Sequence, residues 1–486
     1  MTRRFRFLIA LGLGAITLWY LAGDIGLYSP RMSSHGHLPV TRVNPHNTTE
    51  HIDFWRQFHS LLLASEPECK PPRRTGYAPA TGFNPSEAGP RPDLLKMPTR
   101  DVWRMKRAHQ KFVESIQQSP PSLSYLPGTR GLVTTAGGAY LPVLVISLRM
   151  LRRTGSQLPM EVFLATPDEY EEFICDQVLP SLNAKCVVLT EITNAVPGGG
   201  QIEKYQLKPF AMIFSSFEEI LFLDADAFPI AKPESLFEQQ PFQSANLITW
   251  PDFWASSASP YYYDIASQNI PAMTSRQSTE SGEVLISKKT HLKTLLLCTY
   301  YNFWGPTHYY RLLSQGAAGE GDKETFISAA TAVGEPFYQV REPICAMGHA
   351  TKGGLAGSAM LQFDPIEDYR LARGGDSSIK SSSTAAPKAF FIHANFPKFN
   401  PATVFSKQAV NPAFNDDGTY TRAWTTPQEK IQAFGSDVEK QFWAEILWTG
   451  CELENKFRAW ENRTDICNGV KQYWTAQFGS EDPSRV

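Results

Sequence analysis

Short apolar runs alternate with amphipathic segments of helical period between residues 131 and 226. The apolar runs, at 131–136, 160–166, 185–192 and 218–226, are rich in Val, Leu, Ile and Phe and have the length of buried strands. Segments with apolar residues at helical spacing separate them. This alternation predicts an α/β fold with a mostly parallel, Rossmann-like sheet and helices on both faces.

The chain on either side of this alternation has different patterns. Residues 24–127 contain a stretch dense in Pro and Gly, interrupted by helical patterns at 51–66 and 100–119. We expect a stem there that holds a folded domain away from a membrane. Residues 128–415 then form the α/β domain. Residues 416–486 return to helical periodicity and predict a C-terminal helical extension packed on that domain.

The N-terminus has a basic cluster followed by an uncharged apolar run. Residues 1–6 hold three arginines, and residues 7–23 are just long enough for a short membrane-spanning helix. This order predicts a transmembrane signal-anchor with a cytoplasmic tail and a lumenal remainder, in the thin membrane of the early secretory pathway. A cleaved signal peptide is the alternative, but Tyr20 and Ala22 stand where its small-x-small cleavage site belongs.

The balance of charged residues and two glycosylation sequons limit the classes of function that fit the sequence. Lys and Arg number 46 against 48 for Asp and Glu, a formal net charge of -2, so no basic excess indicates a nucleic-acid partner. The tripeptides that begin at Asn47 and Asn462 are N-glycosylation sequons, as expected of a lumenal chain.

The chain has seven cysteines and no CxxC motif, which argues against a zinc site. Cys175 with Cys186, and Cys451 with Cys467, are the pairs closest in sequence. In an oxidising lumen some cysteines pair, but the sequence leaves the pairing open, and an odd count leaves at least one without an internal partner.

The apolar run at 218–226 ends in Asp224-Ala225-Asp226. Residues i and i+2 of an extended chain point to the same side, so both carboxylates face one cleft at the carboxyl end of the sheet, where such folds bind ligands. Two hard oxygen ligands there suit Mn²⁺ or Mg²⁺, with the remaining ligands from a substrate diphosphate. The alternative is a structural turn in which Asp bonds local backbone groups.

Three further side chains fit such a centre. His393 and Lys398 follow an apolar strand near residue 390, and Lys208 precedes the Asp pair in a helical segment. An imidazole completes a metal shell, and lysines bind phosphate as point charges. Each of the three is also an ordinary structural or solvated residue when taken alone.

At this point several long motifs indicate a family. The segments at 205–229, 249–254, 280–297, 300–330 and 391–401 resemble, in sequence and order, the fungal Golgi mannosyltransferases that build α-linked mannan side chains. The resemblance spans roughly residues 132–410. It implies a GT-A fold, a GDP-mannose donor, Mn²⁺, retention of the anomeric configuration, and a mannan or glycoprotein acceptor in the Golgi, beside other mannosyltransferases.

The motif order is more remotely similar to that of glycogenin-like retaining transferases. In that family a lysine, an Asp-x-Asp pair, and a late histidine with a nearby lysine form the metal and diphosphate site. The pattern carries over to Lys208, Asp224, Asp226, His393 and Lys398. Both α-1,2 and α-1,3 linkages occur in the fungal family, and the segments at 319–330 and 391–401 resemble the α-1,2 members more.

Other residues are candidates for the donor sugar, the acceptor and the nucleotide. Glu280 or Asp322 would stabilise positive charge on the anomeric carbon, unless Glu280 is a solvated loop residue and Asp322 a helix N-cap. Asp252 and Trp250 would bind the acceptor, unless their aromatic surroundings are core. Thr134 and Gly137 would meet the nucleotide at the first strand–helix turn, unless that turn is only structural. The residues concerned are Thr134, Gly137, Trp250, Asp252, Glu280 and Asp322.

Two other function classes compete with a mannosyltransferase. A catalytically inactive carbohydrate-binding or scaffold protein would keep the same fold, but the intact set of Asp, His and Lys residues argues against it. A glycoside hydrolase places its two carboxyl groups roughly 5 Å or more apart across the scissile bond. Neighbouring aspartates that share a cation serve that geometry badly.

Overall fold

The computed structural model of the protein describes residues 45–486 except 88, 200–201, 374–385 and 408–409, and side chains from residue 48 onward. The predicted cytoplasmic tail and signal-anchor, and the Asn47 side chain, lie outside this description. Among the described residues, no helix is both long enough and apolar enough to cross a membrane.

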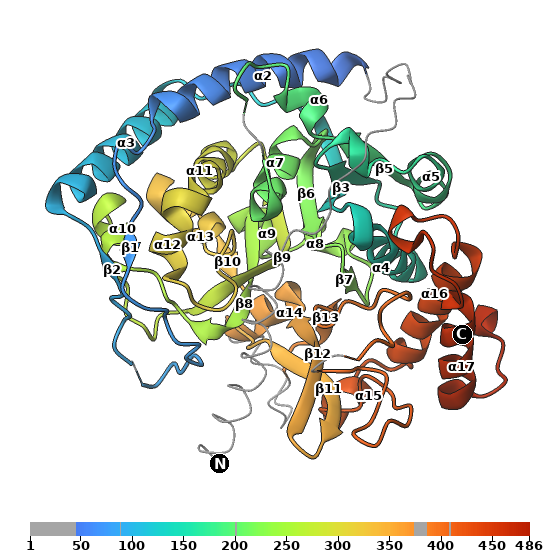
Figure 1. Ribbon diagram of the computed structural model, residues 1–486. Helices are drawn as coiled ribbons and strands as arrows, with labels where there is room; N and C mark the ends of the chain where they lie inside the picture. Colours follow the sequence, from blue (N-terminus) through green and yellow to red (C-terminus); the bar gives the residue numbers. More distant parts are fainter. Residues whose placement is uncertain (1–44, 88, 200–201, 374–385, 408–409) are drawn as a thin grey trace.

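Seven strands form the central sheet in the order β10-β8-β9-β6-β3-β4-β5 (Figure 1). Neighbours are parallel except at β9, which runs antiparallel to both β6 and β8. The mostly parallel sheet expected from the sequence is therefore present, with one reversed strand. The strands are β3 (Leu126–Thr135), β4 (Met160–Leu164), β5 (Ala184–Val188), β6 (Phe217–Leu223), β8 (Leu247–Ala255), β9 (Gln277–Ser287) and β10 (Tyr338–Gln339).

Helices cover both faces of this sheet because β6 and its neighbours are apolar on both sides. Ile220 and Phe222 pack into one core with the helices of one face, whereas Leu221 and Leu223 pack into a second core on the other. Both layers follow from the pleat, which sends successive side chains to opposite faces. The first layer contains α7 (Leu207–Phe214), α11 (Leu292–Phe303), α12 (Tyr310–Ser314) and α13 (Thr325–Val333); the second contains α4 (Leu141–Arg153).

The predicted stem is wrong over its described part, because two long helices in it belong to the folded body. α2 (Pro45–Ala64) and α3 (Thr99–Gln118) run along one side of the molecule (Figure 1) and bury apolar side chains in the first core. Trp55, Phe58 and Phe112 are fully buried. A free linker would expose such residues, so the packed domain begins well before residue 128.

The Pro- and Gly-rich stretch between these helices is also fixed in place. Leu94 N donates to Gln315 Oε1 at 2.7 Å, and Gln315 Nε2 donates to Pro92 O at 2.9 Å. Arg91 Nη2 donates to Pro271 O at 2.8 Å. This stretch contains the paired two-residue strands β1 (Arg73–Arg74) and β2 (Leu95–Lys96). Its composition resembles a linker, but its hydrogen bonds tie it to the domain.

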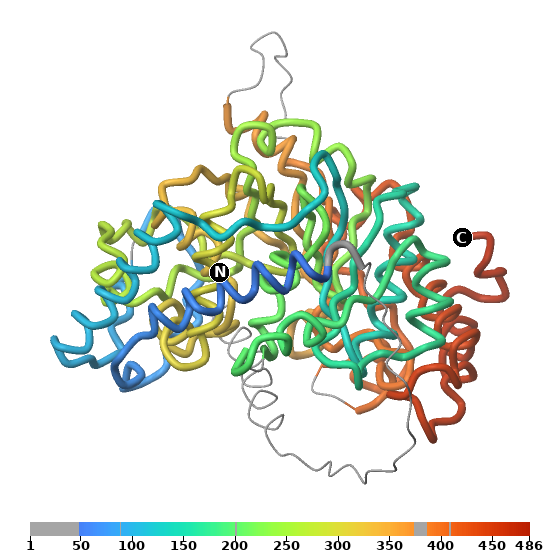
Figure 2. The backbone as a smooth tube through the Cα atoms, turned by 90° about the horizontal axis from the view of Figure 1, so that it is seen from above, coloured from blue at the N-terminus to red at the C-terminus, as the bar shows by residue number. Residues whose placement is uncertain are grey.

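A smaller antiparallel sheet, in the order β11-β12-β13-β7, joins the central sheet to the C-terminal helices. These helices were predicted from periodicity and lie at one end of the molecule against α4, red in Figure 2. Arg149 and Arg153 of α4 both pair with the buried Glu445. The elements are β7 (Ala227–Pro229), β11 (Cys345–Thr351), β12 (Gly354–Phe363), β13 (Ala389–His393), α14 (Pro365–Ala372), α15 (Gln428–Gln432), α16 (Val438–Glu452) and α17 (Ile466–Phe478).

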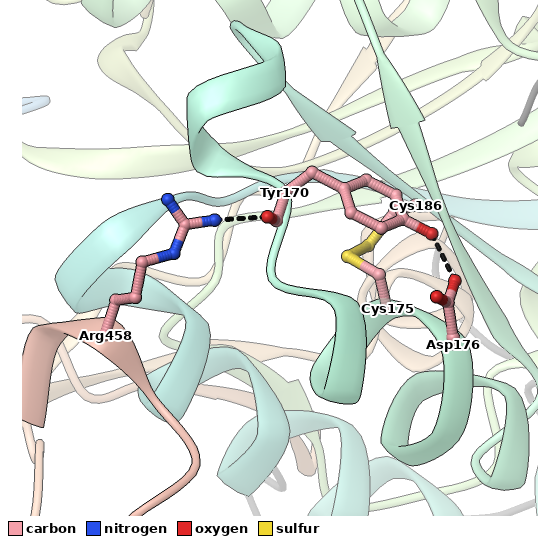
Figure 3. The surroundings of a disulfide bond; sticks show 5 residues. All are labelled: Tyr170, Cys175, Asp176, Cys186 and Arg458. Carbon is pink, nitrogen blue, oxygen red and sulfur yellow. Dashed lines mark hydrogen bonds between the residues drawn. A yellow bond between two sulfur atoms is a disulfide. The ribbon is translucent and has the colours of Figure 1, made fainter. Parts of the chain in front are cut away.

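Both cysteine pairs that are closest in sequence form disulfides. Cys451–Cys467 joins α16 to α17, and Cys175–Cys186 joins a helical turn to β5. Beside the second disulfide, Arg458 of the C-terminal extension donates to the carbonyl of Tyr170 (Figure 3). The remaining cysteines, Cys69, Cys298 and Cys345, are not in disulfides.

The buried face of α3 yields a test of the corrected boundary. Phe112→Ala removes a fully buried ring that stacks on Tyr300 with centroids 4.3 Å apart, and we expect it to destabilise the fold by about 3–5 kcal/mol. Trp103→Ala on the same helix removes a side chain that is 57% exposed, and we expect a change within about 0.5 kcal/mol. Thermal unfolding measures both. Equal, small effects would mean that α3 is an unpacked stem.

Candidate active site

The Asp224 and Asp226 side chains lie where β6 ends, and a second chain segment comes in beside them. Asp224 N donates to Gly282 O at 2.8 Å, which fixes the turn to β9. β7 follows the turn and pairs with β13, so that Ala227 lies opposite His393. Residues far apart in sequence therefore meet at the carboxyl end of the central strand, as the spacing predicted.

Asp226 is buried and holds two positively charged groups. His393 Nε2 lies 3.1 Å from Asp226 Oδ1, and Lys398 Nζ donates to Asp226 Oδ2. Burial alone would raise the pKa of Asp226, but Lys398 and His393 lower it far below its ordinary value. The carboxylate is ionised, and it orients both cations toward the site.

His393 lies between two carboxylates. Its Nδ1 is 3.5 Å from Glu280 Oε1, on the side away from Asp226. Burial would lower the pKa of His393, but Asp226 and then Glu280 raise it well above its ordinary value. The pKa of Glu280 is lowered to about 2, because His393 outweighs the effect of burial. Positive charge is thus required between these carboxylates.

Asp224, Glu280 and His393 form the cluster best placed for a metal ion. One ligand atom from each lies within 4.8 Å of the others. Hard carboxylate oxygens and an imidazole suit Mn²⁺, and carboxylates also suit Mg²⁺. The predicted ligands Asp224 and His393 are in this set. Glu280 joins it in place of Asp226, which contacts His393 instead; the direct ligand role of Asp226 stays a prediction.

Lys208 connects Asp224 to Asp322. Its Nζ lies 3.1 Å from Asp224 Oδ1 and 3.4 Å from Asp322 Oδ2, and it donates to Ser281 Oγ at 3.0 Å. Burial would lower the pKa of Lys208, but Asp224 and then Asp322 raise it. Asp322 is not an N-cap, since its side chain faces Lys208. Burial raises the pKa of Asp322, although Lys208 opposes this.

The two predicted acceptor residues are placed very differently. Trp250 is fully buried and its indole Nε1 donates to Phe363 O at 2.9 Å, so the expectation that it binds the acceptor is wrong and it is a core residue. Asp252 lies closer to the site, where its Oδ2 accepts from Lys323 Nζ at 2.7 Å. Burial raises the pKa of Asp252, although Lys323 opposes this.

The two predicted nucleotide-binding residues lie at the end of β3. Thr134 is fully buried, and its hydroxyl has no hydrogen-bond partner among the described residues, so its side chain faces the core. A nucleotide contact through the backbone N–H groups of this turn stays a prediction. Gly137 is partly exposed, and a Cβ atom there would lie 2.5 Å from the carboxyl carbon of Glu169. Tyr140, three residues after Gly137, contacts a residue of the site, because Lys398 Nζ lies 5.7 Å from its ring centroid.

Sequence reasoning missed three features of this edge. Gly282 makes room for the imidazole, since a Cβ atom there would lie 2.6 Å from His393 Nδ1. Glu283 is fully buried beneath the site, where burial and then Glu280 raise its pKa well above the ordinary value. Lys323 neutralises Asp252. The string Glu-Ser-Gly-Glu at 280–283 was a usable signal, because a buried strand rarely carries two carboxylates.

The arrangement can bind a divalent cation and a phosphate-rich leaving group at one place. Several carboxylates supply ligands and negative charge, and Lys208 and Lys398 supply charge of opposite sign from two sides. Such an arrangement suits group transfer from a phosphate-activated donor assisted by a bound cation.

Comparisons with known proteins agree with this chemistry. A family model described as "Mannosyltransferase putative" matches residues 129–277 and 268–364. Alpha-1,2-mannosyltransferase MNN2 of Saccharomyces cerevisiae is 34% identical, over 79% of this chain and 74% of that protein. Alpha-1,2-mannosyltransferase MNN21 of Candida albicans is 31% identical over 78% of this chain, and MNN24 of the same organism 32% identical over 78%. The match spans just under two thirds of these two Candida proteins, 66% and 64%.

The close approach of Gly282 to His393 gives a test of the metal cluster. Gly282→Ala would push the imidazole out of place, and we expect Mn²⁺ affinity to fall about 10-fold or more. Gly357→Ala is the matched control, because a Cβ atom there meets nothing within 4 Å. Calorimetric titration with Mn²⁺ measures both. Equal affinities in the two variants would exclude His393 from the ion's surroundings.

Proposed function

We propose that this chain, which belongs to the family of the yeast and Candida α-1,2-mannosyltransferases, transfers mannose from GDP-mannose to a mannan or glycoprotein acceptor. The linkage formed is α-1,2, with retention of the anomeric configuration, on a GT-A type of fold. The relatives that support the linkage carry α-1,2 in their names. An α-1,3 linkage is the alternative within the family, and an inactive carbohydrate-binding protein is the alternative outside it.

One observation carries this proposal. Lys208 pairs with Asp224 and Lys398 with Asp226, while His393 lies between Asp226 and Glu280. A purely structural ion-pair network would satisfy its charges without converging on a strand end. Here the groups converge at the position where open α/β sheets bind ligands.

The residues divide the reaction between a leaving group and a sugar. Transfer breaks the bond between the anomeric carbon and the diphosphate, which leaves negative charge on GDP and positive character on the carbon. Lys208 and Lys398 would stabilise the diphosphate, and their effect on rate comes from the charge that develops in the transition state. Asp322, on the far side of Lys208, would face the sugar. A bound divalent cation would supply further charge neutralisation for the departing diphosphate.

The proposed ion is Mn²⁺ or Mg²⁺, held by Asp224, His393 and Glu280 with Asp226 beside them. The donor set fits, because the ligand atoms already lie within 4.8 Å of one another. Mn²⁺ accepts an imidazole with carboxylates more readily than Mg²⁺ does. Asp226 would hold His393 by its second nitrogen and thereby orient it.

We place the enzyme in the Golgi as a single-pass type II membrane protein with a lumenal catalytic domain. Two observations support this location. Both disulfides need an oxidising compartment. Asn462 of the second sequon is exposed, as a glycosylated asparagine must be. Membrane attachment would come from the predicted anchor at residues 7–23, outside the described residues.

Carboxylate-to-amide variants test the reaction itself. Asp224→Asn and Asp226→Asn keep the side-chain shape but remove charge, and we expect each to lower Mn²⁺-dependent mannose transfer about 100-fold or more. Asp264→Asn is the control, since that side chain is 58% exposed and pairs with Lys106. The assay follows transfer from GDP-mannose to an α-linked mannose oligomer, with and without a chelator. Linkage analysis of the product then distinguishes an α-1,2 from an α-1,3 bond. Full activity in either site variant contradicts the proposed centre.

Two truncations test the topology together with the corrected domain boundary. Removing residues 1–44 takes away the predicted anchor and leaves every described element, so we expect a soluble, active protein. Removing residues 1–127 strips α2 and α3 from the first core, so we expect insoluble or unfolded protein. Fractionation and thermal unfolding measure both. If the protein that lacks residues 1–127 is active, the region before residue 128 is a stem after all. If the protein that lacks residues 1–44 stays attached to membranes, a single N-terminal anchor is contradicted.

A further inference from the structure

Residues 69–83, which we call the strap, lie against the loop that carries Asp322. Arg74 Nη1 lies 3.2 Å from Glu320 Oε2, and both side chains are about three-quarters buried, with 27% and 24% exposure. Glu320 also accepts from Gly316 N at 2.6 Å. The strap therefore fixes residues 316–320, which lead directly to Asp322.

The same loop supports the most exposed aromatic ring of the strap. Tyr77 packs on Gly316, where a Cβ atom would come within 2.5 Å of the ring. Ala78 N donates to Gln315 O at 2.9 Å and holds the strap in register. The Arg74 guanidinium lies 5.1 Å from the Tyr77 ring centroid, yet Tyr77 is 74% exposed. The ring is thus fixed against the loop that leads to Asp322 while most of its surface stays open to solvent.

A second anchorage ties the strap to the end of β8, two residues after Asp252. Gly82 bridges Trp254, Phe83 N donates to Phe253 O at 3.2 Å, and Ala255 N donates to Thr81 O at 2.8 Å. Phe253 and Trp254 are both partly exposed. The strap is thus hydrogen-bonded to the end of β8, just after Asp252, whose carboxylate pairs with Lys323.

The order of the strands assigns the two sides of the site. β6, which ends in the Asp pair, lies near the middle of the sheet, with β3 and β4 on one side and β9 and β8 on the other. Tyr140 follows β3 and lies beside Lys398, whose Nζ is 5.7 Å from the ring centroid, so a nucleoside attached to a diphosphate at the two lysines would extend that way. The β8 side, where Asp322, Asp252 and the strap meet, remains for the second substrate.

We propose that the strap and the loop at 316–323 form one wall of the acceptor site, with Tyr77 and Trp254 as stacking surfaces for mannose rings of the acceptor glycan. This inference deepens the proposed function and rests on it. Sugar rings present apolar C–H faces together with hydroxyls, and rigid aromatic rings with a polar end match that chemistry. The acceptor is neutral, so binding needs flat contact surfaces and hydrogen bonds more than charge.

The test compares binding of a short α-linked mannose oligomer to the full chain and three variants. Tyr77→Ala should weaken the oligomer Kd about tenfold, the loss expected when one stacked ring is removed. Tyr77→Phe keeps the ring and should bind as the wild type does. Trp103→Ala removes another exposed aromatic ring, 57% exposed and on α3 outside the strap; it is the control and should leave Kd unchanged.

Steady-state kinetics then separates this inference from the proposed function. In the Tyr77→Ala variant the acceptor KM should rise by the same factor, while the donor KM and hydrolysis of GDP-mannose without acceptor stay at wild-type values. An unchanged oligomer Kd, or donor and acceptor constants that change together, overturns the acceptor wall. A wild type that binds the oligomer through Tyr77 but never transfers mannose would support the wall and overturn the proposed enzyme.

Discussion

The mutual repulsion of carboxylates at one sheet edge is the constraint on which the site depends. Asp224, Asp226, Glu280 and Asp322 meet where β6 ends, and like charges so close are stable only with positive charge between them. Lys208 and His393 supply it from two sides. A divalent cation would supply more. The fold therefore builds an electrostatic arrangement that accepts a cation and a polyanion together, which a nucleotide-activated donor requires.

The surrounding packing makes this arrangement rigid. β13 and β7 bring His393 beside Asp226, and Gly282 leaves the space that the imidazole fills. The Lys208 side chain extends from α7, donates to Ser281 and pairs with Asp224 and Asp322. Charges fixed before substrate arrives need little reorganisation when the diphosphate departs, and such preorganisation is a main source of rate enhancement. The cores on the two faces of the central sheet serve the site by holding these strands and helices in register.

Much of this site was predictable because its residues follow buried strands. The Asp pair follows a central strand of the mostly parallel sheet, as the sequence predicted. His393 and Lys398 come to it by another route, because β13 of the smaller sheet pairs with β7, which directly follows the Asp pair. Trp250 was mispredicted because it lies on the same face of β8 as Ile248 and packs with it in the second core. An aromatic cluster in a sequence does not by itself distinguish a core position from a carbohydrate-binding one. Glu280 was expected at the sugar and lies at the ion cluster, a distinction that only coordinates resolve.

The N-terminal segment shows a different limit of prediction. Pro and Gly indicate irregular backbone, but whether that backbone is free depends on partners that lie more than 200 residues away, such as Gln315 for Leu94. These partners explain how the two halves of the site are built. The donor side uses residues at the ends of strands and in regular helices, whereas the proposed acceptor side combines two loop segments, residues 69–83 and 316–323. A surface made from separate, loop-like segments tolerates substitution better than a strand end does. Acceptor preference can therefore change within this fold while the charge arrangement that activates the donor stays the same.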